Sequence, residues 1–431
     1  MQTADIESVS FKQALLFWLK LGFISFGGPA GHIAIMHQEL VEKRGWISER
    51  RFLHALNYCM LLPGPEAQQL ATYLGWLMHN TLGGVLAGVL FVLPSMLLLM
   101  LLSWLYLDFG QTALVSAVFY GIKPAVTAIV LFAAYRIGSR ALKNGLLWLL
   151  AGLAFLAIFV FNTPFPLIIL IAAIFGAVGG KYLPQYFSVS AHQAYTNSNG
   201  SLAIINDHTP PPCHAQFSWR RFFNVVAVCV LLWAAVFGAL YAVQGWHGVL
   251  TQMAWFFTKA AFLTFGGAYA VLPYVYQGAV EHYHWLTAAQ MMDGLALGET
   301  TPGPLIMIVT FVGFLGGSHT GVAALAAIIV TYFTFLPSFL FILAGAPLIE
   351  STHGNLKFTA PLTAITAAIV GVIINLAVFF AQHVLFLNQK FDAVAALITL
   401  AALIALFRYK VGVIPIIGCC AAFGVLLTVL N

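Results

Sequence analysis

Apolar stretches follow one another along the whole chain, separated by short polar segments. Six stretches fill the first half, one stands alone, and six fill the second half. Their ranges are about 11–36, 52–79, 81–107, 112–137, 145–162 and 164–180, then 222–243, then 251–276, 290–316, 321–348, 358–384, 391–407 and 411–430. A run of about 20 apolar residues is long enough to cross a bilayer as a helix. The pattern therefore predicts an all-α polytopic membrane protein.

Two stretches in each half are broken in the middle by glycine or proline. Residues 20–29 read KLGFISFGGP, and residues 259–268, a shift of 239 along the chain, read KAAFLTFGGA. The same shift places Trp46 on Trp285, and the triplet Pro63-Gly64-Pro65 on Pro302-Gly303-Pro304. Helix breakers at membrane depth are tolerated where they line a cavity. Broken helices in both halves of an internal repeat indicate a transporter's binding site.

The repeat divides the chain into three parts. Residues 1–180 form an N-terminal repeat, 181–243 a polar linker with one extra transmembrane helix, and 244–431 a C-terminal repeat. Segment 197–212 is rich in Asn, Ser, Gly and Pro, which is typical of a flexible linker. Six stretches and one extra helix start the second repeat on the opposite side of the membrane. The repeats are therefore predicted to have inverted topology.

The distribution of basic residues predicts how the broken stretches sit. Of the 18 Lys and Arg residues, all but Lys20, Lys123 and Lys259 lie in loops or at the ends of the stretches, and are counted as loop residues. If every stretch crosses, ten of these loop residues lie on one side and five on the other. If the four broken stretches return to their own side, the division becomes fourteen against one, Lys390. Orientation follows the Lys/Arg bias, so we predict nine crossings and four re-entrant hairpins, with the N-terminus and linker cytoplasmic.

Composition narrows the class of protein. Only 7% of the 431 residues are charged and 61% are hydrophobic, against roughly 25% charged in soluble domains. Loop bias accounts for the net charge of +5, so nucleic-acid binding is not expected.

The polar start, residues 1–11, lacks the basic region of a signal peptide. The five cysteines form no CxxC pair, and the linker histidines do not fit a metal site. No Walker loop, nucleophile elbow or HExxH motif occurs, and we expect neither an enzyme nor a cofactor.

The breaks supply the chemistry expected of an anion site. Glycines allow sharp reversals and proline suits the first turn of a helix, and helix N-termini attract anions. Four such ends meeting near the bilayer midplane suit a small oxyanion. The predicted binding residues are Lys20, Ser25, Gly27, Gly28, Pro65, Lys259, Thr264, Gly266, Gly267 and Pro304. The simpler interpretations are that glycine and proline are common in membrane helices and that the lysines snorkel.

Acidic residues are rare in the apolar stretches. Glu66 directly follows the first Pro-Gly-Pro triplet, and Glu299 precedes the second, but they are not repeat equivalents. A desolvated carboxyl group can carry a proton, so these two residues are candidates for coupling. The alternative is a carboxylate held by a lysine or by backbone donors. Lys123 is either a third site cation or the partner of an acid, and the role of Asp293 stays open.

Four long motifs resemble the chromate ion transporter family in its long, two-domain form. They are FISFGGPAGHIAIM (23–36), LPGPEAQQLATYLG (62–75), FLTFGGAYAVLP (262–273) and DGLALGETTPGPL (293–305). The resemblance implies a secondary transporter of the bacterial inner membrane that exports chromate, is driven by the proton gradient or membrane potential, and confers chromate resistance. Protons, the bilayer and a second copy in a homodimer are the other expected partners.

The motifs do not separate chromate from sulfate, because both are tetrahedral dianions of similar size. Two further alternatives stay open. One is a membrane-embedded enzyme that uses Glu66, Glu299 or Asp293 as acid and base. The other is an anion channel, since paired broken helices also line pores.

Overall fold

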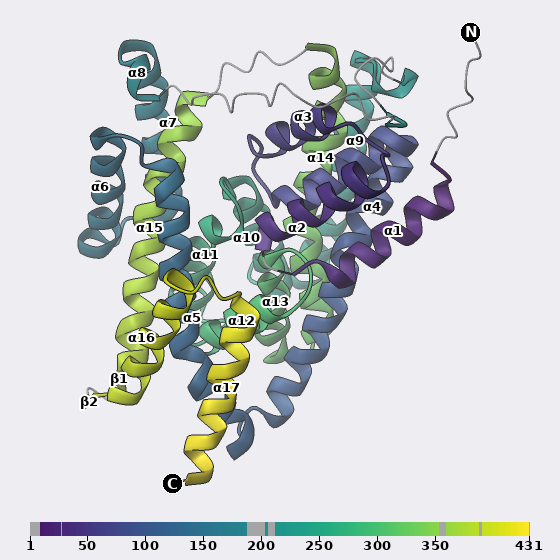
Figure 1. Cartoon of the computed structure of the whole chain (residues 1–431). Helices are drawn as coiled ribbons and strands as arrows, with labels where there is room; N and C mark the ends of the chain where they lie inside the picture. Colours follow the sequence, from purple (N-terminus) through teal and green to yellow (C-terminus); the bar gives the residue numbers. More distant parts are fainter. Residues whose placement is uncertain are drawn as a thin grey trace.

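The computed structural model describes residues 9–26, 28–187, 203–205, 212–352, 359–387 and 390–430, and these are almost entirely helical (Figure 1). The first half contains α1 (Phe11–Ile24), α2 (Gly28–His37), the π-helix η1 (Gln38–Lys43), α3 (Glu49–Cys59), α4 (Glu66–Phe109), α5 (Ala113–Ala141), α6 (Gly145–Phe161), α7 (Phe165–Tyr182) and α8 (Pro184–Phe187). The linker contributes the 3₁₀ turn η2 (Cys213–Ala215), which α9 (Trp219–Gln244) follows. The predicted all-α class is confirmed.

The second half repeats this order of elements. It contains α10 (Val249–Leu263), α11 (Ala268–Tyr276), the π-helix η3 (Gln277–His282), α12 (Ala288–Thr300), the 3₁₀ turn η4 (Leu305–Met307), α13 (Ile308–Ser318), α14 (Ala323–Thr352), α15 (Thr359–Leu385), α16 (Ala393–Phe407) and α17 (Val413–Leu430), with a two-residue hairpin of β1 (Phe386–Leu387) and β2 (Lys390–Phe391) between α15 and α16. The two π-helices begin 239 residues apart, as the sequence repeat predicts.

Helix lengths differ from the prediction of nine crossings. Among the described residues, six helices are long and apolar enough to cross a membrane: α4, α5, α7, α9, α14 and α15. The other three predicted crossings fall in the shorter helices α6, α16 and α17. At 1.5 Å per residue, the 15 residues of α16 extend about 23 Å, less than the hydrocarbon core of about 30 Å.

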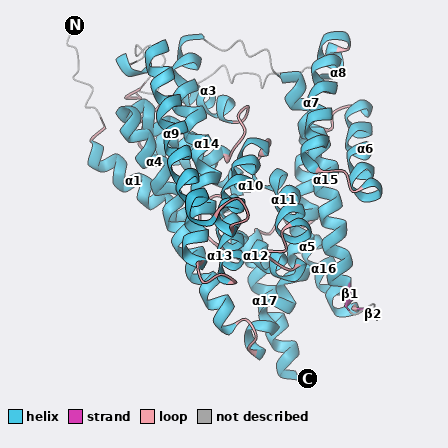
Figure 2. Cartoon of the chain, turned by 180° about the vertical axis from the view of Figure 1, so that it is seen from behind, coloured by secondary structure: helices cyan, strands magenta, loops and turns pink. Residues whose placement is uncertain are grey.

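The halves exchange their last two helices. Helices α6 and α7 pack on α15 of the other half, and α16 and α17 pack on α5. Helices α5 and α15 also pack on each other, and they run in opposite directions (Figure 1). Seen from behind, α6, α7 and α15 stand together on one side of the molecule (Figure 2).

In each half the first broken stretch folds back on itself. The ring of Phe17 on α1 lies 5.6 Å from the ring of Trp46, which follows η1. The equivalent rings of Phe256 and Trp285 are 5.7 Å apart. After each break the chain therefore returns to the level of its first arm.

The linker lies on the loop between the first two broken stretches. The Ser48 N–H donates to the Ile205 carbonyl at 3.0 Å, and the Ile204 N–H donates to Gly45 at 2.9 Å. His214 of the linker meets the Trp76 carbonyl at 2.9 Å. Loop 43–51 and the linker thus share one face of the molecule. If every stretch crossed the membrane, they would lie on opposite faces.

Candidate functional site

The four breaks meet as two equivalent pairs across the halves. The Gly64 N–H donates to the Thr264 carbonyl oxygen at 2.7 Å, and the Gly303 N–H donates to the Ser25 carbonyl oxygen at 2.7 Å. The sequence repeat maps Ser25 onto Thr264 and Gly64 onto Gly303. Each half therefore offers its second break to the first break of the other half, and both contacts use the same atoms.

Both central glycines are required by backbone conformation and by space. Gly64 has φ +132° and Gly303 has φ +101°, values that side chains with a Cβ rarely adopt. A Cβ on Gly64 would lie 2.5 Å from Ser338 Oγ, and one on Gly303 would lie 2.6 Å from Ser95 Cβ. Ser95 and Ser338 are themselves equivalents, at a shift of 243. The reciprocal relationship thus extends to the helices behind the breaks.

Helices begin at the breaks where the prolines and glycines predict. Helix α4 starts directly after Pro65, η4 directly after Pro304, and α11 directly after Gly267. The start of α4 lies against the start of α11, since Glu66 Oε1 is 4.0 Å from the position of a Cβ on Gly267. Unpaired N–H groups at helix starts carry partial positive charge, so this region favours an anion.

Three buried hydroxyl groups at the breaks have no partner among the described residues. They are the Oγ atoms of Ser25, Ser95 and Ser338, in residues at most 1% exposed. A buried donor without an acceptor is costly, and an oxyanion would satisfy it. Ser95 and Ser338 were not among the predicted binding residues. Their signal was the weak echo Leu-Pro-Ser at residues 93–95 and 336–338.

Other predicted binding residues are placed differently. Thr264 Oγ1 donates to the Ala260 carbonyl within α10 at 2.7 Å, so its hydroxyl is already used. Lys20 is exposed on α1. Lys259 is half-buried, with its ammonium 5.8 Å from the Trp255 ring centroid. Gly27 lies outside the described residues. The equivalent Gly266 adopts φ +75°, as a sharp reversal requires.

The two predicted coupling acids belong to different helices, and both lie near the start of α11. Glu66 opens α4, and the Glu299 carboxylate near the end of α12 accepts a hydrogen bond from the Tyr269 hydroxyl on α11. Arg136 and Arg140 are exposed near the end of α5. The sequence pattern predicts both arginines as loop charges. Their spacing of four residues, at the end of an apolar stretch, is the sequence signal that both lie on one face of a helix.

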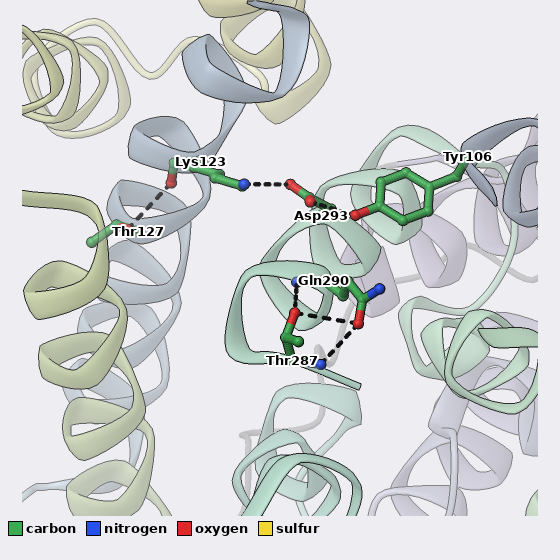
Figure 3. Close-up of polar contacts among 6 residues, drawn as sticks. All are labelled: Tyr106, Lys123, Thr127, Thr287, Gln290 and Asp293. Atoms are coloured by element: carbon green, nitrogen blue, oxygen red, sulfur yellow. Dashed lines mark hydrogen bonds and ion pairs between the residues drawn. The ribbon is translucent and has the colours of Figure 1, made fainter. Parts of the chain in front are cut away.

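Lys123 and Asp293 form an ion pair that joins the halves (Figure 3). Lys123 Nζ on α5 lies 3.4 Å from Asp293 Oδ1 on α12, and the Tyr106 hydroxyl on α4 donates to Asp293 Oδ2 at 2.8 Å. The side chain of Asp293 is 4% exposed. Of the two roles left open for Lys123, the partner of an acid is the one observed. Among the described residues no cluster of His, Cys, Asp or Glu is suited to a metal.

Fold and site together define a multi-pass helical membrane protein with paired helix breaks at its centre. A family model described as chromate transporter matches residues 12–177 and 251–425. The chain belongs to this chromate transporter family.

The chain is similar to named proteins over most of its length. It is 31% identical to a chromate transport protein of Cupriavidus metallidurans, over 93% of this chain and 89% of the relative. It is 35% identical to a chromate transport protein of Pseudomonas aeruginosa, over 85% and 80%. An uncharacterized transporter of Methanocaldococcus jannaschii is 26% identical, over 84% and 83%. No solved structure matches.

Proposed function

We propose that this protein is a secondary active transporter that exports chromate from the bacterial cytoplasm across the inner membrane and so confers chromate resistance. The observation that carries the proposal is the pair of equivalent contacts, Gly64 to Thr264 and Gly303 to Ser25, which joins the four helix breaks in two pairs across the halves. Membership of the chromate transporter family supports chromate as the substrate. The alternative substrate is sulfate, which has the same shape and charge.

The contacts support two inverted repeats. A pseudo-two-fold axis exchanges the halves, and the opposite directions of α5 and α15 are those of an inverted pair (Figure 1). The broken stretches are then re-entrant hairpins, which agrees with the contact of Phe17 with Trp46 and with the position of the linker. With fourteen of fifteen loop cations on the linker side, that side is cytoplasmic.

The oxyanion binds between the breaks in this proposal. Helix starts and the hydroxyls of Ser25, Ser95 and Ser338 donate to its oxygens, while Arg136 and Arg140 draw it from the cytoplasm. Glu66 and Glu299 exchange protons as the carrier changes state. The breaks are repeat equivalents, whereas Glu66 and Glu299 are not. Both halves therefore share the binding of the anion, while the coupling to protons is asymmetric.

Everted membrane vesicles test the function directly. Export appears as uptake of radiolabelled chromate, which saturates, is inhibited by excess unlabelled chromate and collapses with an uncoupler. Uptake of labelled sulfate without uptake of chromate would mean that sulfate is the substrate. Linear uptake that ignores the uncoupler would favour a channel, and conversion of chromate by purified protein in detergent would favour an enzyme.

A further inference from the structure

A cavity of about 710 Å³ lies beside Lys259, apart from the four breaks. It is enclosed by the α6–α7 turn, α10, the segment from α11 to η3, and α15. None of its described lining residues belongs to a break. Amides such as Asn375 and aromatic rings such as Tyr283 make up much of the lining, with Glu281 and Lys259 as its carboxylate and ammonium groups. Among the described residues Lys259 forms no ion pair.

The cavity lies toward the face opposite the linker. Helix α9 starts near the linker, and its 26 residues extend about 39 Å, so α10 begins after a helix long enough to cross to the far face. There the Tyr283 ring stacks on Trp285 at 4.5 Å, and Trp285 lies against Phe257 of α10. The α6–α7 turn is also the end of those helices away from the linker.

The repeat gives this cavity a counterpart on the linker face. Four lining residues, Lys259, Gly278, His282 and Tyr283, are the equivalents of four residues at a shift of 239: Lys20, Glu39, Lys43 and Arg44. The second set is a charged cluster. Lys43 Nζ donates to Glu39 Oε1 at 2.7 Å, and Arg44 Nε lies 3.6 Å from Glu39 Oε2. The hydrogen bond from Lys43, with the charges of Arg44 and Lys20, lowers the pKa of the Glu39 carboxyl.

We infer that the cavity beside Lys259 is a second binding site for a small dianionic oxyanion, the vestibule on the side opposite the linker. The inference rests on the proposed function and separates Lys259 from the site at the breaks. Its ammonium is the positive charge that faces the anion, and Asn375 and the other amides donate hydrogen bonds. Lys20, Lys43 and Arg44 outnumber Glu39 and Glu42 on the linker side, whereas Lys259 is balanced by Glu281 on this side. The anion is therefore captured more strongly on the linker side and released on the other.

The test uses thiol reactivity in full-length protein reconstituted in liposomes. Asn375→Cys reports on the cavity, in a background where the five native cysteines are replaced by Ala. Negatively and positively charged methanethiosulfonates are added separately from each side. We expect reaction from the side opposite the linker. We expect the ratio of the anionic to the cationic rate to fall about tenfold in Lys259→Gln and to be kept in Lys259→Arg, because one unit charge attracts one reagent and repels the other.

The exposed Lys390→Gln is the matched control and leaves the ratio unchanged. An unchanged ratio in Lys259→Gln, or reaction only from the linker side, would overturn the vestibule. Chromate flux is measured separately, in liposomes of wild-type protein without reagent. If wild-type protein moves chromate but Lys259→Gln leaves the ratio of the anionic to the cationic rate unchanged, only the inferred vestibule is wrong. If the ratio responds without chromate flux, the proposed function is wrong and the anion-attracting cavity stands.

Discussion

Gly64 lies directly against Ser338 of the other half, with 2.5 Å between the serine oxygen and the place that a Cβ on Gly64 would occupy. Ser95 lies in the same way against Gly303. The two contacts are repeat equivalents, so the second break of each half packs against a serine of the other half.

Replacing either glycine should abolish transport. Gly64→Ala or Gly303→Ala forces a Cβ onto a serine and strains a backbone of positive φ, which costs about 1–2 kcal/mol before any clash. We expect chromate uptake in vesicles to fall at least about tenfold. Gly238→Ala on α9, where a Cβ meets no neighbour, is the control and should transport normally. Normal transport by both break variants would show that the breaks do not form the site.

The sequence predicts the breaks but not how they pair. The breaks are local, because Gly-Gly and Pro-Gly-Pro interrupt apolar runs, and α4, α11 and η4 start where the pattern indicates. The pairing of Gly64 with Thr264 is a contact between residues 200 positions apart, and no local propensity encodes it. Ser95 was missed because a serine inside an apolar helix usually bonds to its own backbone. Only its position behind Gly303 shows that its hydroxyl is free.

The hydroxyls of Ser95 and Ser338 should matter for binding and not for folding. Each is a buried donor with no acceptor in the part of the chain that the structure describes, so Ser95→Ala and Ser338→Ala remove a group that costs stability in the empty protein. We expect unchanged or higher thermal stability in detergent, together with a KM for chromate raised about tenfold. Ser103→Ala, which loses a hydroxyl bonded to Leu99, is the comparison. A lower stability without a change in KM would make the two serines structural.

Glu66 should oppose the anion when it is charged. At an effective dielectric constant of about 20, unit charges about 8 Å apart repel by about 2 kcal/mol. Glu66→Gln should therefore lower the KM for chromate at least about tenfold and make flux independent of an imposed proton gradient. Uptake by vesicles with and without the gradient measures both effects. The exposed Glu42→Gln is the control. If the gradient dependence survives in Glu66→Gln, the coupling residue lies elsewhere, and Glu299→Gln is the next variant.

The ion pair of Lys123 with Asp293 should show strong coupling in a double-mutant cycle. Removing one partner of a buried pair leaves an uncompensated charge and costs about 3–5 kcal/mol, whereas removing both costs much less. Lys123→Met and Asp293→Asn should each lower the unfolding temperature in detergent, and the double variant should recover most of the loss. Lys143→Met, on the exposed loop, should have no effect. Additive losses would mean that the two groups do not act as a pair.

Loop 43–51 and the β-hairpin should be labelled from opposite sides of the membrane. Arg50 is exposed at the start of α3, next to the segment that pairs with the linker, and Lys390 is exposed in β2. Re-entrant hairpins place Arg50 in the cytoplasm and Lys390 outside. In a background where the five native cysteines are replaced by Ala, an impermeant maleimide should therefore label Arg50→Cys only in everted vesicles. It should label Lys390→Cys only in intact cells treated to open the outer membrane. Ser48 is unsuitable as a probe, because its buried hydroxyl accepts the Arg51 N–H at the start of α3. Labelling of Arg50→Cys from outside would mean that the first broken stretch crosses the bilayer.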